Sequence, residues 1–157
     1  MLTIHHVESH EEIDTVRALF EEYHASLGVD LCFQDFEAEL DGLPGAYAPP
    51  GGRLLLASNG TAPVGCVALR PVDSSRCEMK RLFVRSDARG LGAGRALVVR
   101  VMDEARTMGY AEVVLDTLPM MTTAQQLYQA LGFRDIAPYR ANPVVGTRYL
   151  GCSLVKA

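Results

Sequence analysis

Three things are missing from this 157-residue sequence, and each absence excludes a class of protein. No apolar run reaches the roughly 18 residues of a membrane-spanning helix, and even the run 54–57 is closed in by Arg53 and Asn59. The first residues turn polar too early for a secretory signal, so we expect a cytoplasmic protein with no membrane partner. Basic residues are not in excess, because the net charge is −4, and this disfavours a nucleic-acid partner.

Metal-binding patterns are missing as well. No C-x-x-C pair occurs and no histidine stands at ligand spacing from a cysteine, so we expect no metal site. His5 and His6 would point to opposite faces of a strand and could not easily share one ion. In a reducing cytoplasm the cysteines are expected to be free thiols, and they stand at Cys32, Cys66, Cys77 and Cys152.

The composition is otherwise that of a globular domain. Hydrophobic residues make up 48% and charged residues 22%, and the length predicts a single domain over residues 1–157. Acidic residues dominate residues 1–45, where Arg17 is the only Lys or Arg, and basic residues dominate residues 80–106. The basic stretch is either a solvated helix face or a local anion site.

Local patterns predict the elements of the first half of the chain. Residues 2–7 alternate weakly and indicate an edge strand. A capping box, Ser9 with Glu12, opens an amphipathic helix that Gly28 ends, and a second short helix is expected over 33–40. Residues 42–52 hold several prolines and glycines and are predicted to be a loop. Asn59-Gly60 predicts a hairpin between the apolar strands 53–58 and 63–69.

The second half alternates strands with helices. A strand is expected over 77–84, then a glycine-rich loop at 90–94, then a helix whose apolar stripe runs to Met108 and stops at Gly109. A β-branched run at 112–118 predicts a buried strand, and 124–131 a short helix stopped by Gly132. The extended runs 133–139 and 147–155 close the chain. The strand–helix–strand unit at 77–118 requires a parallel strand pair, so we predict an α/β fold with a mixed, twisted sheet and helices on both faces.

The glycine loop carries the first chemical signal. Residues 89–95 read Arg-Gly-Leu-Gly-Ala-Gly-Arg between a strand and a helix. Glycines let backbone amides approach a ligand, and amides at a helix N-terminus bind anions, so a pyrophosphate is the expected ligand. The alternative is a tight turn whose glycines serve packing only. The dinucleotide fingerprint fails because Arg95 stands where a third glycine is needed, and no Lys follows as in a Walker motif.

A known family fits these residues. Arg89, Gly92 and Gly94 form an R-x-x-G-x-G motif, and residues 124–133 read A-x-x-L-Y-x-x-L-G-F. With the strand 78–84 before the loop and the helix and strand after it, the sequence resembles the GNAT superfamily of acetyl-CoA-dependent N-acetyltransferases. The close resemblance covers about residues 77–134. It implies a three-layer fold with a mostly antiparallel sheet, one splayed parallel pair, and acetyl-CoA as co-substrate.

The resemblance also assigns cofactor contacts. It implies that the strand segment Leu82, Phe83 and Val84 pairs through its backbone with the pantetheine arm of the coenzyme, like an added strand. It places the pyrophosphate on the loop and helix start, at Arg89, Gly90, Leu91, Gly92, Ala93, Gly94 and Arg95. Many relatives carry a cofactor-contacting Asn where this chain has Met121, which puts that contact in doubt. Thr122 or Thr123 is expected to cap the following helix.

The catalytic expectations rest on the same resemblance. Tyr128 matches the family's general acid, which protonates the leaving thiolate, although its place on an apolar stripe would also suit a core residue. Glu78 stands where some relatives place a general base, or it is a strand-end carboxylate paired with Lys80 or Arg81. Asp116 is a second candidate base or an anchor for a cationic amine. Arg140 would meet an acceptor carboxylate, which favours an amino-acid-like substrate.

The implied activity is acetyl transfer from acetyl-CoA to a primary amine of a small molecule or peptide, by direct attack in a ternary complex. A strand backbone N–H would stabilise the oxyanion, and no base stands beside any cysteine to support an acetylated thiol. Two alternatives stay open: a non-catalytic acetyl-CoA-binding regulatory module, and a domain for a different phosphate ligand. A homodimer is an option, with the strand 147–155 as the exposed edge.

Overall fold

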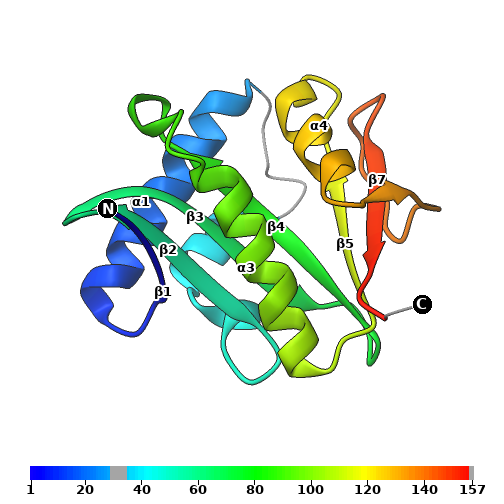
Figure 1. The fold of residues 1–157 in the computed structure, drawn as a ribbon, viewed down its shortest axis with the longest axis horizontal. Helices are drawn as coiled ribbons and strands as arrows, with labels where there is room; N and C mark the ends of the chain where they lie inside the picture. The colour runs from blue at the N-terminus through cyan, green and yellow to red at the C-terminus, as the bar shows by residue number, and fades with distance from the viewer. Residues whose placement is uncertain (29–34, 156–157) are drawn as a thin grey trace.

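The computed structural model describes residues 1–28 and 35–155, and its centre is one seven-stranded sheet of order β1-β2-β3-β4-β5-β7-β6 (Figure 1). Among the strands of the described residues, only β4 and β5 run parallel; the other neighbouring pairs are antiparallel. This confirms the predicted mixed sheet with one parallel pair. The strands are β1 Leu2–His6, β2 Arg53–Asn59, β3 Ala62–Pro71, β4 Arg76–Val84, β5 Glu112–Thr117, β6 Arg134–Asp135 and β7 Arg148–Ser153.

Helices cover both faces of the sheet (Figure 1). In the described residues these are α1 His10–Leu27, α2 Phe36–Asp41, α3 Ala93–Met108 and α4 Thr122–Ala130, with short 3-10 turns at Gly45–Tyr47 and Ser86–Ala88. Within the same residues, no helix combines the length and the apolar character that a bilayer crossing needs. The predicted order of strands and helices is confirmed. Of the second predicted helix, residues 33 and 34 lie outside the described residues, Asp35 is the N-cap, and the helix α2 runs from Phe36 to Asp41.

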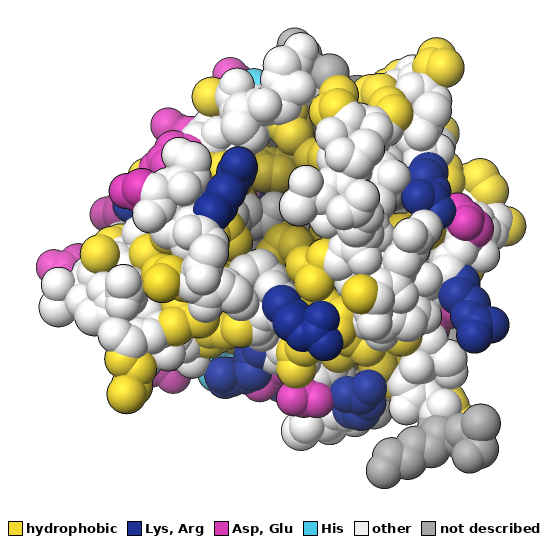
Figure 2. Space-filling model, turned by 45° about the horizontal axis from the view of Figure 1, so that its top comes forward, with side chains coloured by type: hydrophobic (Ala, Val, Ile, Leu, Met, Phe, Trp, Pro, Cys, Tyr) yellow, Lys and Arg dark blue, Asp and Glu magenta, His cyan; other side chains and the backbone are white. Residues whose placement is uncertain are grey.

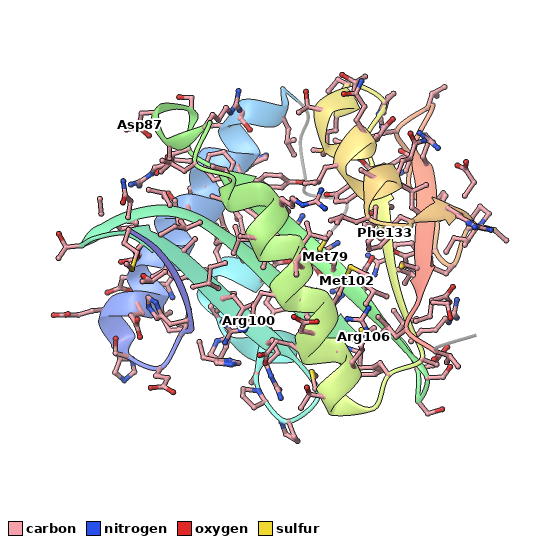
Figure 3. All side chains as sticks on the ribbon, viewed as in Figure 1. Met79, Asp87, Arg100, Met102, Arg106 and Phe133 are labelled. Atoms are coloured by element: carbon pink, nitrogen blue, oxygen red, sulfur yellow. The ribbon has the colours of Figure 1, made fainter. Side chains whose placement is uncertain are left out.

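Two hydrophobic cores result, one on each face of the sheet. The core under α3 and α4 includes Met79 of β4, Met102 of α3 and Phe133 after α4, which Figure 3 labels. The core under α1 includes Phe20 and the β2 and β3 side chains of Leu56 and Cys66. Because β2 and β3 contribute alternate residues to the two cores, the helices on both faces depend on one strand register.

The local signals at α1 and at the first hairpin are confirmed. The Ser9 hydroxyl accepts a hydrogen bond from the Glu12 amide at 3.1 Å, and the Glu12 carboxylate accepts one from the Ser9 amide at 3.3 Å. These two bonds satisfy amides that the first helical turn leaves open. Gly28 ends the helix with a φ of 68°, and residues 59–62 join β2 to β3 through the predicted turn.

Three expectations are wrong. The helix after the glycine loop begins at Ala93, so Gly94 lies in its first turn and not in the loop. Neither threonine caps α4, because the helix already includes Thr122 and its N-cap, Met121, makes no side-chain capping bond. The run 147–155 is not a sheet edge: β7 lies between β5 and β6, so β1 and the two-residue β6 are the edges. The structure therefore does not support a homodimer contact through residues 147–155.

Candidate active site

The parallel strands β4 and β5 separate after a short paired stretch. They pair at three positions, of which Glu78 with Val114 is the last. From there β4 continues for six residues to Val84 without a partner on that side, and the two ribbons diverge (Figure 1). The backbone edge of β4 that faces β5 is therefore open over residues 79–84, at the carboxyl ends of both strands.

A β-bulge in β4 decides which side chains face which core. Cys66 pairs with Phe83 and Ala68 with Lys80, so β4 carries one extra residue against β3. The extra residue falls at Arg81, whose φ of 60° is left-handed. The bulge shifts the alternation by one position: Glu78 and Lys80 face the α1 side, whereas Leu82 and Val84 pack against the α3 core. The strand expected over 77–84 is confirmed, but the regular alternation of its side chains between the two faces is broken at Arg81.

The bulge is held by a buried ion pair. Arg81 donates to both carboxylate oxygens of Glu39 at 2.9 Å, and its guanidinium lies 5.2 Å from the centre of the Phe36 ring. Only 3% of the Arg81 side chain is exposed. These contacts join α2 to the sheet, and they hold a non-glycine residue in a backbone conformation that it rarely adopts.

A large cavity of about 560 Å³ opens between α1, the glycine loop and α4. Figure 2 turns the top of Figure 1 toward the viewer and shows a hollow with apolar side chains at its floor. The cavity shares four lining residues with a smaller one of about 60 Å³ between the separated strands: Tyr23, Leu82, Met121 and Ala124. The two cavities therefore adjoin and lead from the glycine loop to the opening between β4 and β5.

The glycine loop presents open amides to the large cavity. Gly90 and Gly92 have φ values of 95° and 73°, and both line the cavity together with Ala93 and Gly94. The first helical bond of α3 runs from Ala96 to the Gly92 carbonyl, and the N-cap offers no side chain to the first turn. Among the described residues, the amides of 90–95 therefore have no hydrogen-bond acceptor.

Positive charge flanks these amides. The side chains of Arg89 and Arg95 are exposed, and neither forms an ion pair within residues 1–28 and 35–155. An anionic group with two or three oxygens could use the amides, the helix dipole and the guanidinium groups together. The loop thus has the chemistry of a diphosphate site.

Tyr128 stands at the inner end of this path. Its side chain is 6% exposed, lines the small cavity and packs against Phe133 with the ring centres 5.6 Å apart. Burial raises the pKa of the Tyr128 phenol, which keeps it protonated at neutral pH. In the described part of the chain the Tyr128 hydroxyl has no hydrogen-bond partner.

Glu78 lies behind the cavities. The side chain is fully buried, and it is not among the described residues that line either cavity. One carboxylate oxygen accepts from Arg70 at 2.8 Å and from Arg140, and the other accepts from the Tyr139 hydroxyl at 2.5 Å. Glu78 thereby ties β3 and the loop before β7 to β4.

Asp116 and Lys80 lie in the small cavity. Asp116 accepts a hydrogen bond from the side-chain amide of Asn142 at 3.2 Å. Burial lowers the pKa of Lys80 to about 8, and the neighbouring charge of Arg81 contributes to the decrease. Sequence reasoning missed Lys80 and Asn142 as parts of the site. Period-two spacing from Glu78 could have indicated Lys80, whereas the approach of Asn142 depends on how the last loop folds back.

The described cysteines are unsuited to carry an acetyl group. Cys66, Cys77 and Cys152 are buried, and burial raises the pKa of each thiol, to about 12 for Cys77. The thiolate is the reactive form, so little of it is present at neutral pH. Cys32 lies outside the described residues.

Comparison with known proteins gives consistent matches. Residues 13–133 match the model of the acetyltransferase (GNAT) family. An uncharacterised N-acetyltransferase of Schizosaccharomyces pombe is 37% identical over 158 residues, which cover 99% of this chain and 96% of the relative. One of Dictyostelium discoideum is 31% identical over 198 residues, covering 87% of this chain and 92% of the relative.

Solved structures show the same fold. An acetyltransferase of the GNAT family from Staphylococcus aureus superposes with a TM-score of 0.82 at 21% identity, covering 99% of this chain and 100% of that one. An acetyltransferase from Salmonella typhimurium, solved with acetyl-CoA, has a TM-score of 0.72 at 17% identity, covering 99% and 95%.

Proposed function

Since the chain belongs to the acetyltransferase (GNAT) family and is an acetyl-CoA-dependent N-acetyltransferase, we propose that it acetylates a primary amine directly, with both substrates bound together. The acceptor is the amine of a small molecule or a peptide. The observation that carries this proposal is the continuity between the open amides of the glycine loop and the cavity that holds Tyr128 and Asp116.

The large cavity suits the coenzyme. The open amides of 90–95 and the charges of Arg89 and Arg95 suit its diphosphate. The unpaired edge of β4 at Leu82–Val84 suits an extended pantetheine arm, which would add to the sheet like a strand. When bound, acetyl-CoA supplies an activated acetyl thioester. Met121 lines both cavities, so this wall offers a thioether where many relatives are expected to offer an amide.

Two side chains of the small cavity handle protons in this proposal. Tyr128 holds the proton that the leaving thiolate needs, since burial keeps the phenol protonated. Asp116 takes the proton of the attacking amine directly or through water, because an amine with a pKa of about 10 is mostly protonated at neutral pH. An unpaired backbone N–H of β4 beyond the bulge stabilises the negative charge that develops on the carbonyl oxygen.

Glu78 was the first candidate for the base, and its contacts favour a different role. Both of its oxygens are engaged and the side chain has no exposed surface. We assign it as a positioning residue that holds Arg140. Glu78→Gln should therefore raise the KM for the acceptor and leave kcat nearly unchanged. Asp116→Asn should lower kcat. The reverse pattern would return the role of base to Glu78.

Two measurements test the proposal as a whole. Calorimetry should show tighter binding of CoA than of ADP or NAD, and tighter binding of NAD would reject the site. Tyr128→Phe should lower kcat by about 10²- to 10⁴-fold, the usual contribution of a general acid, with the KM for acetyl-CoA unchanged. The matched control is Tyr110→Phe, because the Tyr110 hydroxyl donates to the Gly51 carbonyl outside both cavities. Equal activity of the two variants would exclude Tyr128 as the acid.

A further inference from the structure

Two arginines share one buried carboxylate on the α1 side of the sheet. Arg70 at the end of β3 and Arg140 in the loop before β7 both donate to the same oxygen of Glu78. The three side chains come from segments far apart in the sequence, and Glu78 lies two residues before Lys80, which lines the small cavity. Two guanidinium charges against one carboxylate leave one positive charge without compensation in this cluster.

Both guanidinium groups keep donors available for a ligand. Arg70 uses only Nε, and Arg140 uses one terminal nitrogen, in the hydrogen bonds of the described residues. Their side chains are 28% and 27% exposed, whereas Glu78 is fully buried. The positive charge therefore lies on the solvent side of the cluster. Each guanidinium carries five N–H groups and can bind a carboxylate in bidentate fashion.

Among residues 1–28 and 35–155, the neighbouring acids do not neutralise the pair. Glu39 lines a pocket of about 290 Å³ together with Arg70, but both of its oxygens are held by Arg81. Asp35 lies at the exposed rim of the same pocket. Asp116, in the small cavity, accepts from Asn142. The side of the site away from Tyr128 is therefore a place for an anion.

The strand register gives the distance from this pair to the reaction centre. Arg70 pairs with Glu78, and Glu78 with Val114, so these residues form one row across three strands. Lys80 and Asp116 stand two residues further along β4 and β5, on the same face. Two residues along a strand span about 7 Å. A small molecule can reach from Asp116 to the arginine pair.

We propose that the acceptor is an amino acid or a similar amine that carries a carboxylate, which Arg70 and Arg140 bind while the amine faces Asp116. This inference rests on the proposed function and names its substrate class. Glu78 orients the two guanidinium groups, and the substrate carboxylate adds the second negative charge. The competing view is that the cluster only fastens the last loop to the sheet, which predicts no preference for acids.

A panel of matched amines tests the inference. Each α-amino acid, β-alanine and 4-aminobutyrate is compared with its primary amide, and release of CoA is followed with excess acetyl-CoA. The best acid should exceed its amide at least about 10-fold in kcat/KM, as expected for one charge-assisted contact. Equal or better use of the amides, or of polyamines and aminoglycosides, overturns the inference and leaves the proposed function standing. Binding of acetyl-CoA without acetylation of any acid in the panel overturns it too. Failure to bind acetyl-CoA rejects both.

Two variants distinguish a role in binding the substrate carboxylate from a role in holding the last loop against the sheet. Arg140→Gln and Arg70→Gln should each raise the KM for the best acid about 10- to 100-fold, reduce the ratio of acid to amide, and leave the KM for acetyl-CoA unchanged. The control Arg76→Gln removes a partly exposed arginine at the start of β4, whose ion pair in the described residues is with the turn residue Asp73, and it should match the wild type. An equal loss with acids and amides would mean that the arginines serve only the fold. Arg70→Gln leaves the Arg140 contact intact and so keeps the test open if the loop variant does not fold.

Discussion

Replacing the buried Lys80 should stabilise the folded protein at neutral pH. Lys80 is 6% exposed, and burial lowers its pKa from the usual 10.5 to about 8. At pH 7 the folded chain must hold a charged ammonium in a site that favours the neutral amine. A pKa difference of one corresponds to about 1.36 kcal/mol, so the charge costs the folded state about 3 kcal/mol. Lys80→Met removes this cost.

The pH dependence separates this charge effect from any change in packing around residue 80. Because the pKa is lower in the folded state, the unfolded chain binds more protons between about pH 8 and 10.5, and the stability of the wild type rises with pH in that range. From pH 7 to pH 9.5 this group contributes a gain of about 2 kcal/mol to the wild type. The variant lacks this gain. A change in packing alters the free energy of unfolding by the same amount at both pH values.

Urea unfolding followed by far-ultraviolet circular dichroism measures the difference, and this probe suits a chain that has no tryptophan. We expect the free energy of unfolding of the variant minus that of the wild type to fall by about 2 kcal/mol between pH 7 and pH 9.5. A difference that stays constant over this range would show that Lys80 is not perturbed, and would refute the argument from burial.

Three further predictions follow from the described contacts. Arg81→Gln leaves the Glu39 carboxylate buried without its partner, so it should lower the free energy of unfolding by about 3–5 kcal/mol in urea titrations. The double variant, with Glu39→Gln added, should recover part of this loss. Gly92→Val forces a β-branched residue to a φ of 73°, so it should raise the KM for acetyl-CoA and lower the melting temperature. An unchanged KM would contradict binding of the coenzyme by the amides of this loop. Ser9→Ala removes the α1 cap and should lower the free energy of unfolding by about 1 kcal/mol in urea titrations without changing kcat.

The cofactor side of the site could be anticipated because its signals are contiguous in the sequence. Arg89 to Arg95 form one short loop whose glycines and position before a helix already indicate the chemistry. Tyr128 was proposed through its local motif, and the structure places it in the small cavity. On the acceptor side the sequence suggested Arg140 and Asp116, but the meeting of Arg140 with Arg70 could not be anticipated. Arg70 and Arg140 come from segments 70 residues apart, and only the pairing of β3 with β4 and the return of the last loop bring both to Glu78.

The errors have a related origin. The residues of the run 147–155 predict a strand but do not indicate which strands pair with it. Its place between β5 and β6 therefore could not be predicted. The bulge at Arg81 was equally hidden, because a residue with a side chain is an unexpected choice for a left-handed backbone position. That conformation is stabilised by Glu39 and Phe36 from α2, which lie about forty residues earlier in the chain.

By itself, the amino-acid sequence determined the order of strands and helices, the start of α1, the first hairpin and the glycine loop before α3, because caps, turns and periodicity depend on residues only a few positions apart. Tertiary structure alone decided the separation of β4 from β5, the change of face at Arg81 and the charge cluster around Glu78. These features arise from contacts between distant segments, whose geometry depends on how the whole sheet pairs and packs.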